Sequence, residues 1–348
     1  MGDNLLASVI VVNYNGKEHL ARCLESLSST KEAEIIVVDN ASSDGSADLV
    51  KSAFPEVQLI RSQTNLGFGE GCNMGARVAK GDYLAFINPD TIVEQDWLDA
   101  LINALKNRPD AGMATSQILQ MDQPDRISAC GNDIHISGLT LGRGMGQIRD
   151  SFPEIEEVTA ISGASFCVRS DTFYQIGGFD QDFFLYMEDT DLSLRMRLSG
   201  YKCLYAPQSV VYHDYTLNIS PRKTFYQERN RYLMLLKNYR WLTLLIFLPV
   251  LLLAEVVTWG FVLLRDRKHA RNKLQAYLWI PNHWKEINRH RSRVQQLRNV
   301  KDRDLLKPSQ TRLAYEQTGG GTITRLAHIV FDSLFYILKQ IALLLIWW

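Results

Sequence analysis

The sequence is poor in cysteine and contains no closely spaced cysteine pair. Its five cysteines, Cys23, Cys72, Cys130, Cys167 and Cys203, are an odd number, and none belongs to a C-x-x-C motif. This pattern argues against a disulfide framework and against a cysteine-based zinc site. Most of these cysteines have apolar neighbours, so we expect small buried thiols in a reducing compartment.

A secretory leader is also missing from the start of the sequence. Residues 1–4 are acidic, and the apolar run that follows them is short. A secretory signal needs a basic start and a longer apolar segment. We therefore expect the N-terminal part of the protein to remain in the cytosol.

The chain as a whole lacks net charge, but its charges are unevenly distributed. It has 38 Lys or Arg and 38 Asp or Glu, yet residues 265–303 contain 12 basic and 3 acidic residues. Residues 1–264 contain 22 basic and 32 acidic residues. An acidic body followed by a basic segment indicates contact with a membrane surface or another polyanion.

No nucleic-acid motif or aromatic-lined groove accompanies the basic segment, so nucleic acid is not an expected partner. Anionic membrane lipids, or the diphosphate of a lipid-linked acceptor, fit a segment of this charge better.

Short apolar runs alternate with helical patterns in the first half of the chain. Continuous β-branched runs at residues 8–13 and 34–39 are typical of strands buried on both faces. Further strands are expected at residues 57–60 and 82–88. Between them we expect a helix with Leu20, Cys23, Leu24 and Leu27 on one face, and further helices near residues 46–53, 70–80 and 94–107. This alternation predicts an α/β fold built on a mostly parallel sheet.

Polar residues follow three of these strands. Asn13, Asp39 and Asn88-Pro89-Asp90 stand at the carboxyl ends, which is where such sheets bind ligands. Residues 65–75 are rich in glycine but are not a dinucleotide fingerprint, because Cys72 stands where the last glycine is required. Each feature alone also fits a structural role, as a turn, a loop cap or a close helix–sheet contact.

A second acidic cluster, Glu188-Asp189-Thr190-Asp191, follows the aromatic run at residues 183–186. If residues 189–199 are helical, Asp189 lies in the first turn, where the helix N-terminus favours a carboxylate. Aromatic neighbours would instead raise its pKa and suit a general base. The alternative is an N-capping cluster in which Arg195 pairs with Asp191.

Taken together and in this order, these motifs resemble those of the inverting family 2 glycosyltransferases with the GT-A fold. The residues of the motifs are similar to those of the rhamnosyltransferase-like branch, which builds bacterial cell-surface polysaccharide. The resemblance extends over about residues 8–235. It is carried by Asn13-Tyr14-Asn15, residues 37–46, Asn65-Leu66-Gly67-Phe68 with Gly71, Asn73 and Gly75, Asn88-Pro89-Asp90, Ser162-Gly163-Ala164, Gly177-Gly178-Phe179-Asp180, residues 183–192 and Val211-Tyr212-His213.

The resemblance implies a nucleotide-sugar donor and a role for each matching position. Asp189 matches the catalytic base, and Asp90 with His213 matches the site of a Mg²⁺ or Mn²⁺ ion that bridges the donor diphosphate. The implied donor-binding set is Asn13, Asp39, Asn65, Gly71, Asn88, Asp90 and Arg229. The implied acceptor and sugar set is Gly163, Ala164 and Glu188.

One position departs from the family pattern. Asn88 replaces the first aspartate of the D-x-D motif, so the motif supplies a single carboxylate and captures a hard cation more weakly. The nitrogen ligand from His213 shifts the preference slightly toward Mn²⁺. A histidine at this position also fits an ordinary core or loop residue.

The implied reaction is a single displacement with inversion, in which Asp189 takes the proton of the acceptor hydroxyl. The acceptor would be a lipid-linked or growing glycan, and dTDP-rhamnose is the donor that the branch suggests. A different class of function stays open, namely a membrane-bound scaffold of the same fold that binds nucleotide sugar without turnover.

Residues 241–264 form an apolar stretch that is just long enough to cross a bilayer. A single crossing would place the basic segment outside the cell, against the positive-inside tendency. Pro249 and Glu255 also suit a crossing helix poorly. We therefore expect a re-entrant or interfacial pair of helices.

Residues 326–348 repeat this apolar character with a polar stripe at helical spacing. The stripe comprises His328, Asp332, Tyr336, Lys339 and Gln340, which predicts a helix in the membrane interface. A core or oligomer-interface helix is the alternative.

A flexible joint is expected at residues 319–321, and a homo-oligomer could form through the C-terminal helices. We expect residues 1–235 to form the GT-A catalytic domain and residues 236–348 a helical, membrane-associated region containing the basic segment. The expected location is the cytoplasmic face of the cell membrane.

Overall fold

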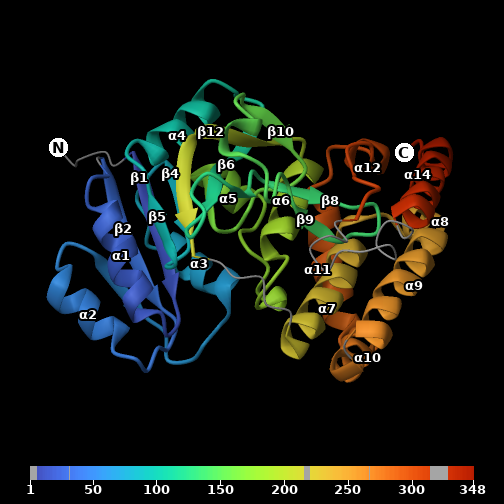
Figure 1. Cartoon of the computed structure of the whole chain (residues 1–348), viewed down its shortest axis with the longest axis horizontal. Coiled ribbons are helices and arrows are strands. Elements are labelled where there is room, and N and C mark those ends of the chain that lie inside the picture. The colour runs from blue at the N-terminus through green and yellow to red at the C-terminus, as the bar shows by residue number, and fades with distance from the viewer. Residues whose placement is uncertain (1–5, 31, 215–219, 266, 314–327) are drawn as a thin grey trace. The chain divides into compact units, whose positions relative to one another are not determined.

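The computed structural model describes residues 6–30, 32–214, 220–265, 267–313 and 328–348, and it divides into two compact units (Figure 1). The first unit comprises residues 1–132, 142–196 and 201–217, and the second comprises residues 133–141, 197–200 and 218–348. The joint expected at residues 319–321 lies outside the described residues.

The first unit is built on a sheet that has ten strands in the described residues. Along its main path the order is β10-β12-β6-β11-β4-β1-β2-β3, and β5 and β7 pair at its side with β12 and β6. Strands β1 to β4, β6 and β12 run in one direction, whereas β10 and β11 run against it. The predicted α/β fold with a mostly parallel sheet is therefore confirmed. The strands are β1 (Ala7–Asn13), β2 (Ala33–Asp39), β3 (Gln58–Arg61), β4 (Tyr83–Ile87), β5 (Thr91–Val93), β6 (Ala111–Gln120), β7 (Ile127–Ala129), β10 (Glu156–Val158), β11 (Ser165–Arg169) and β12 (Lys202–His213).

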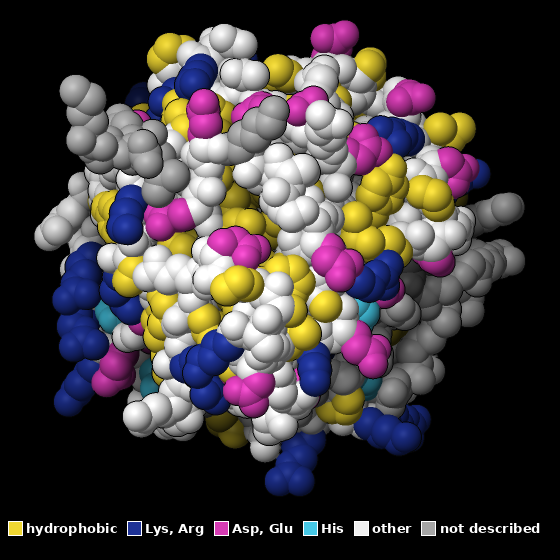
Figure 2. All heavy atoms as spheres, turned by 90° about the vertical axis from the view of Figure 1, so that its left-hand side faces the viewer, with side chains coloured by type: hydrophobic (Ala, Val, Ile, Leu, Met, Phe, Trp, Pro, Cys, Tyr) yellow, Lys and Arg dark blue, Asp and Glu magenta, His cyan; other side chains and the backbone are white. Residues whose placement is uncertain are grey.

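Helices follow the first strands as the sequence predicts. Every residue of β1 is buried, and α1 buries the apolar face that includes Leu20 and Leu24. Burying one such side chain contributes about 1.5–3 kcal/mol, so this packing holds the strand ends in place. On the face shown in Figure 2, basic and acidic side chains are intermixed. The helices are α1 (Lys17–Leu27), α2 (Ser46–Ala53), α3 (Phe68–Ala76), α4 (Trp97–Lys106), α5 (Ser170–Gln175) and α6 (Glu188–Leu198), with short 3₁₀ turns at Arg149–Ser151 and Gln181–Phe183. All five cysteines, each within the described residues, are buried thiols.

The second unit is helical. Helix α7 packs against α8, α10 and α11, while α9 contacts α8, α10 and α14. Its described helices are α7 (Pro221–Asn238), α8 (Trp241–Ile246), α9 (Leu248–Arg265), α10 (Ala270–Asn282), α11 (Trp284–Gln296), α12 (Asp302–Leu306) and α14 (Ser333–Leu345), with a 3₁₀ turn at Arg267–His269 and a π-helical turn at His328–Asp332. A small hairpin pairs β8 (Asn132–Ile134) with β9 (Thr140–Gly142). All of α7 falls in this unit, and the extent of the catalytic domain, predicted as residues 1–235, stays a prediction.

The apolar stretch at residues 241–264 is divided between two helices. Helix α8 ends at Ile246 and α9 begins at Leu248, so the stretch is a helical pair rather than one straight helix. By length and composition, His328–Leu345 is the one helix in the described parts of the chain that could cross a membrane, with a mean hydropathy of 1.5. Such a helix is weak support for a crossing when it stands alone.

Candidate active site

The ends of β1 and β2 place two predicted donor-binding residues side by side. Asn13 and Asp39 are paired in the register of the two strands, and both are buried. Asn13 Oδ1 and both carboxylate oxygens of Asp39 accept no hydrogen bond from any described residue. Arg61 Nε lies 3.8 Å from Asp39 Oδ2, too far for a hydrogen bond. A buried acceptor without a hydrogen bond costs about 1–3 kcal/mol, so these oxygens are suited to accept hydrogen bonds from the hydroxyl and N–H groups of a ligand.

The loop after β3 is held to the end of β2 by side-chain amides. Asn40 Nδ2 donates to Asn65 Oδ1 at 3.1 Å and to the Gly67 carbonyl at 3.0 Å, and Asn40 Oδ1 accepts from the Leu66 N–H at 2.9 Å. Asn65 therefore shapes this loop, and Asn40, to which the sequence assigned no role, anchors it. Asn40 directly follows Asp39 within the motif at residues 37–46, and this position is the feature of the sequence that could have indicated its role.

Two glycines of this region are required by packing. A Cβ at Gly67 would lie 2.2 Å from the Phe184 carbonyl oxygen, and its φ of +84° favours glycine. A Cβ at Gly71 would lie 2.6 Å from Cγ1 of Val12. Close packing of α3 on β1 thus explains Gly71, and the donor-binding roles of Asn65 and Gly71 stay predictions.

Asp90 and His213 meet at the ends of two paired strands. Residue His213 pairs with Thr91 in the β12–β5 register, and its Nε2 lies 3.2 Å from Asp90 Oδ1. Burial alone would raise the pKa of Asp90, but the neighbouring imidazole of His213 outweighs burial and leaves the pKa below its usual value. A carboxylate beside an imidazole is a donor set that fits a divalent cation such as Mg²⁺ or Mn²⁺.

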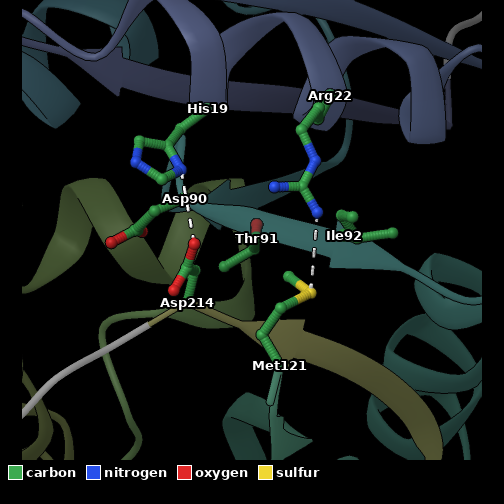
Figure 3. A pocket seen from close by; sticks show the side chains of 7 residues that line it. All are labelled: His19, Arg22, Asp90, Thr91, Ile92, Met121 and Asp214. Atoms are coloured by element: carbon green, nitrogen blue, oxygen red, sulfur yellow. Dashed lines mark hydrogen bonds and ion pairs between the residues drawn. The ribbon is translucent and has the colours of Figure 1, made fainter.

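A shallow depression adjoins Asp90 on the α1 side (Figure 3). His19 and Arg22 reach toward it from α1, and His19 Nδ1 lies 3.7 Å from Asp214 Oδ2. Arg22 Nη2 lies 3.9 Å from the sulfur of Met121. The structure therefore brings two basic residues close to Asp90 that the sequence had left without a role.

Asp189 lies in the first turn of α6, as predicted. Its Oδ2 accepts from the Gly163 N–H at 2.9 Å and from Asn132 Nδ2 at 3.3 Å, while its Oδ1 accepts from the Thr190 N–H at 2.7 Å. Burial raises the pKa of Asp189, and these hydrogen bonds counteract the rise without cancelling it. A firmly held carboxylate with a raised pKa is what a general base requires.

The predicted acceptor segment links this carboxylate to the end of β4. The Asn88 N–H donates to the Ala164 carbonyl at 3.0 Å, and the N–H of the preceding residue, Gly163, donates to Asp189. A Cβ at Gly163 would lie 3.3 Å from Asp189 Oδ2, so glycine allows this close approach. The structure thus brings together Asn88, Gly163, Ala164 and Asp189. Asn132, which was missed because it is distant in sequence and outside any quoted motif, also belongs here.

Glu188 is buried next to Asp189. Its Oε2 has no hydrogen-bond partner among the described residues. Burial, together with the neighbouring charge of Asp189, raises the pKa of Glu188 to about 8. Glu188 therefore holds a proton near neutral pH. Its role at the acceptor or sugar stays a prediction.

The backbone before α6 is strained, and the helix itself is braced. Phe184, Tyr186 and Met187 have positive φ values between 60° and 67°, a conformation that bulky residues rarely adopt. Arg195 Nε donates to Asp191 at 2.7 Å, which confirms the expected pair, and its Nη1 donates to the carbonyl oxygens of residues 176 and 178. Asp191 and Arg195 therefore brace the loop that leads into α6, while Asp189 remains at the helix start.

Replacing Glu188 by glutamine should change how stability depends on pH. Because the pKa of Glu188 is about 8 in the folded state and 4.5 ordinarily, the folded state holds a proton that the unfolded chain releases. The wild type should lose about 2–4 kcal/mol of stability between pH 5 and pH 8.5, and Glu188→Gln should not. Urea denaturation at the two pH values measures the difference. Glu56→Gln, at an exposed site of the same unit, is the control, and parallel pH profiles for wild type and Glu188→Gln would contradict the assignment.

Arg229 lies in the second unit, on α7. Its guanidinium stacks on the Trp279 ring at 4.7 Å and the Tyr226 ring at 5.1 Å, and its Nε donates to Asn230 Oδ1 at 2.8 Å. The predicted role of Arg229 at the donor phosphates stays a prediction.

Comparison with known proteins identifies the family of this chain. The model of the glycosyl transferase family 2 matches residues 8–149, and that of the glycosyl transferase family group 2 matches residues 83–284. The N-acetylglucosaminyl-diphospho-decaprenol L-rhamnosyltransferase of Mycobacterium tuberculosis is 30% identical over 234 residues, which cover 59% of this chain and 75% of that protein. The rhamnosyltransferase WbbL of Escherichia coli is 27% identical over 223 residues, which cover 57% of this chain and 80% of WbbL.

Among solved structures, Staphylococcus aureus TarS 1–349 in complex with UDP-GlcNAc matches with a TM-score of 0.55 at 16% identity. The match covers 96% of this chain and 90% of that one, and at this identity it shows the fold alone. The chain therefore has the GT-A fold and belongs to the family 2 glycosyltransferases, in their rhamnosyltransferase-like branch.

Proposed function

We propose that this protein is an inverting, metal-dependent glycosyltransferase that acts at the cytoplasmic face of the cell membrane. It moves a sugar from a nucleoside diphosphate donor, with dTDP-rhamnose as the first candidate, to a hydroxyl of a lipid-linked or growing cell-surface glycan. The lipid-linked acceptor is supported by the name of the mycobacterial relative, an N-acetylglucosaminyl-diphospho-decaprenol L-rhamnosyltransferase.

The observation that carries this proposal is the setting of Asp189. Its carboxylate stands at a helix start, its pKa is raised, and four groups, two of them backbone N–H groups, donate to it. Asp189 takes the proton from the acceptor hydroxyl while that oxygen bonds to the anomeric carbon. The bond from that carbon to the diphosphate breaks on the opposite face, so the configuration inverts. No general acid is needed, because the diphosphate leaves as a stable anion, in contrast to a glycosidase.

Asp90 and His213 are the residues that would hold the divalent cation. When bound, such a cation neutralises the negative charge of the leaving diphosphate. Asn13 and Asp39 have buried acceptors that suit the base and ribose of the donor. All four residues lie at strand ends of the first unit, where α/β sheets bind ligands.

Donor binding should depend on Asp90. We expect Mn²⁺ with dTDP-rhamnose to raise the melting temperature of the wild type, because a ligand at about 100 times its Kd stabilises by about 2.7 kcal/mol. Chelation with EDTA, or the change Asp90→Asn, should remove most of this rise. A thermal-shift panel of nucleotide sugars with and without Mn²⁺ measures the effect and identifies the donor.

The control is Asp99→Asn, at an exposed position on α4. It should respond to donor and metal as the wild type does. If Asp90→Asn keeps the full metal-dependent rise, Asp90 is not a metal ligand. If no nucleotide sugar changes the melting temperature of the wild type, the proposed donor class is wrong.

A further inference from the structure

The second unit exposes an unusual amount of apolar side chain. Among the described residues, 25 large hydrophobic side chains are exposed, and 19 of them lie between Trp241 and Trp347. Soluble monomers rarely expose contiguous apolar patches larger than a few hundred Å², and larger ones mark contact surfaces. This distribution indicates that the second unit binds a partner through its apolar surface. The exposed residues are separate from those proposed to transfer the sugar.

Helix α9 exposes large apolar side chains along one of its sides, although Val250 and Val262 are buried. Leu248, Leu252 and Val256 follow one another at intervals of four residues, so they line one side of the helix. Leu252 is 66% exposed and Val256 is 60% exposed. In a helix on a soluble surface this side would be polar.

Two polar side chains of α9, Glu255 and Thr258, contact other helices of the unit. Glu255 accepts from Arg231 Nη2 on α7 at 2.5 Å and lies 3.1 Å from Lys273 Nζ on α10. Lys273 also donates to Thr258 Oγ1 at 2.9 Å. Arg231 and Lys273 are both 0% exposed and also bind Glu228, at 2.8 and 2.7 Å. Two carboxylates thus neutralise two cations inside the helical unit.

These ion pairs offset the free energy that is lost when the carboxylate of Glu255 is removed from water in an apolar helix. Burial alone would raise the pKa of Glu255, but Arg231 and Lys273 hold it at about 2. Tyr232 and Tyr277 donate further hydrogen bonds to the same carboxylate. The charge on α9 is therefore satisfied by α7 and α10, and the outward side of α9 is left apolar.

The C-terminal helix is also attached to its unit, through two polar side chains and the buried Phe335 and Ala342. Lys339 Nζ donates to the carbonyl oxygens of Lys307 at 2.9 Å and Ser309 at 2.6 Å, and Asp332 accepts from the Leu313 N–H at 3.3 Å. Two residues of the predicted polar stripe, Lys339 and Asp332, therefore contact residues 307–313, whereas Tyr336 and Gln340 of the stripe are exposed. The helix also exposes apolar side chains, among them Leu344, which is 81% exposed.

Charge and aromatic content favour a lipid surface over a second protein copy. Exposed basic side chains follow α9 at Arg267, Lys268 and Arg271, and further ones lie on α11 at Lys285 and Arg289. Six of the seven tryptophans of the chain lie in residues 241–348. Basic residues attract anionic headgroups, and tryptophan favours the boundary between headgroups and acyl chains.

Helix α8 also exposes apolar side chains, Leu242 and Leu245. We propose that α8, α9 and α14 form a lipid-facing surface that lies in the interface of an anionic membrane without crossing it. Glu255 and Thr258 tie α9 to α7 and α10, and Lys339 ties α14 to residues 307–313, so both helices are held to the unit with apolar side chains exposed. The surface follows the general pattern of helices that lie in the plane of the interface.

Vesicle flotation of the full-length protein tests this surface. We expect binding to vesicles of phosphatidylcholine with 30% phosphatidylglycerol, and at least tenfold weaker binding to phosphatidylcholine alone. The double change Leu252→Glu with Val256→Glu should weaken binding to the anionic vesicles at least tenfold. Its matched control is Ile148→Glu with Ile155→Glu, two exposed apolar positions of the first unit, which should bind as the wild type does. Circular dichroism and melting temperature verify that each variant is folded.

Three results would overturn the proposal. The first is unchanged vesicle binding by the α9 variant. The second is wild-type protein that stays with the vesicles at pH 11 in carbonate, as a crossing helix would. The third is a wild-type oligomer that ignores vesicles and that the α9 variant dissociates, since the occupant would then be a second copy of the chain. None of these readouts uses sugar transfer, so failure of the proposed enzymatic function gives a separate result.

Discussion

The change Asp189→Asn should reduce sugar transfer by about 10²–10⁴-fold and leave donor binding largely intact. An amide cannot take the proton of the acceptor hydroxyl. The surrounding groups all donate to Asp189, so an Asn NH₂ group would face at least one N–H donor. This conflict costs about 1–3 kcal/mol of stability, which a melting curve will show separately from the loss of turnover.

Release of nucleoside diphosphate, with and without a lipid-linked acceptor, is the measurement. The exposed change Asp99→Asn on α4 serves as the control and should keep full activity. Near-wild-type turnover in Asp189→Asn would remove Asp189 from the role of base. If the wild type binds donor but releases no diphosphate with any acceptor, the protein is a scaffold of the same fold rather than an enzyme.

The change Arg231→Met should lower the stability of the second unit by about 3–5 kcal/mol, because it leaves a buried carboxylate without its partner. Arg231 is fully buried and binds both Glu228 and Glu255, so its loss gives the network a net negative charge. Lys273 remains and reduces the effect without cancelling it. Denaturant unfolding followed by the fluorescence of the C-terminal tryptophans reports on this unit.

Arg222→Met, at an exposed site on the same helix, is the matched control and should change stability by less than about 1 kcal/mol. Adding Glu255→Gln to Arg231→Met restores neutrality and should recover part of the loss. An Arg231→Met protein as stable as the wild type would show that the network contributes little to the second unit.

Local patterns in the sequence determined much of the first unit. The apolar runs at residues 8–13 and 34–39 became β1 and β2, and the spacing of Leu20, Cys23, Leu24 and Leu27 gave the buried face of α1. These features depend on neighbours within a few positions, where side-chain periodicity and backbone preference are readable. The start of α6 at Glu188 and the Asp191–Arg195 pair were predictable for the same reason.

Contacts between distant segments decided the details of the site. Gly71 reads equally well as a phosphate contact or a packing residue, and only its approach to Val12 shows the packing. Asn132 carries no local signal, and it reaches Asp189 across 57 positions because the fold brings the two together. His19 and Arg22 were likewise unremarkable on α1 until the structure placed them beside Asp90.

Residues 241–348 show most clearly which features the sequence determines and which depend on tertiary structure. Its apolar stretches, basic segment and tryptophans are properties of the sequence, and they indicate a membrane surface whatever the fold. The sequence does not show how the charge of Glu255 in the apolar stretch is neutralised, because its partners Arg231 and Lys273 come from other helices. Only tertiary packing turns the charge inward and the leucines outward, since it sets which side of each helix is neutralised.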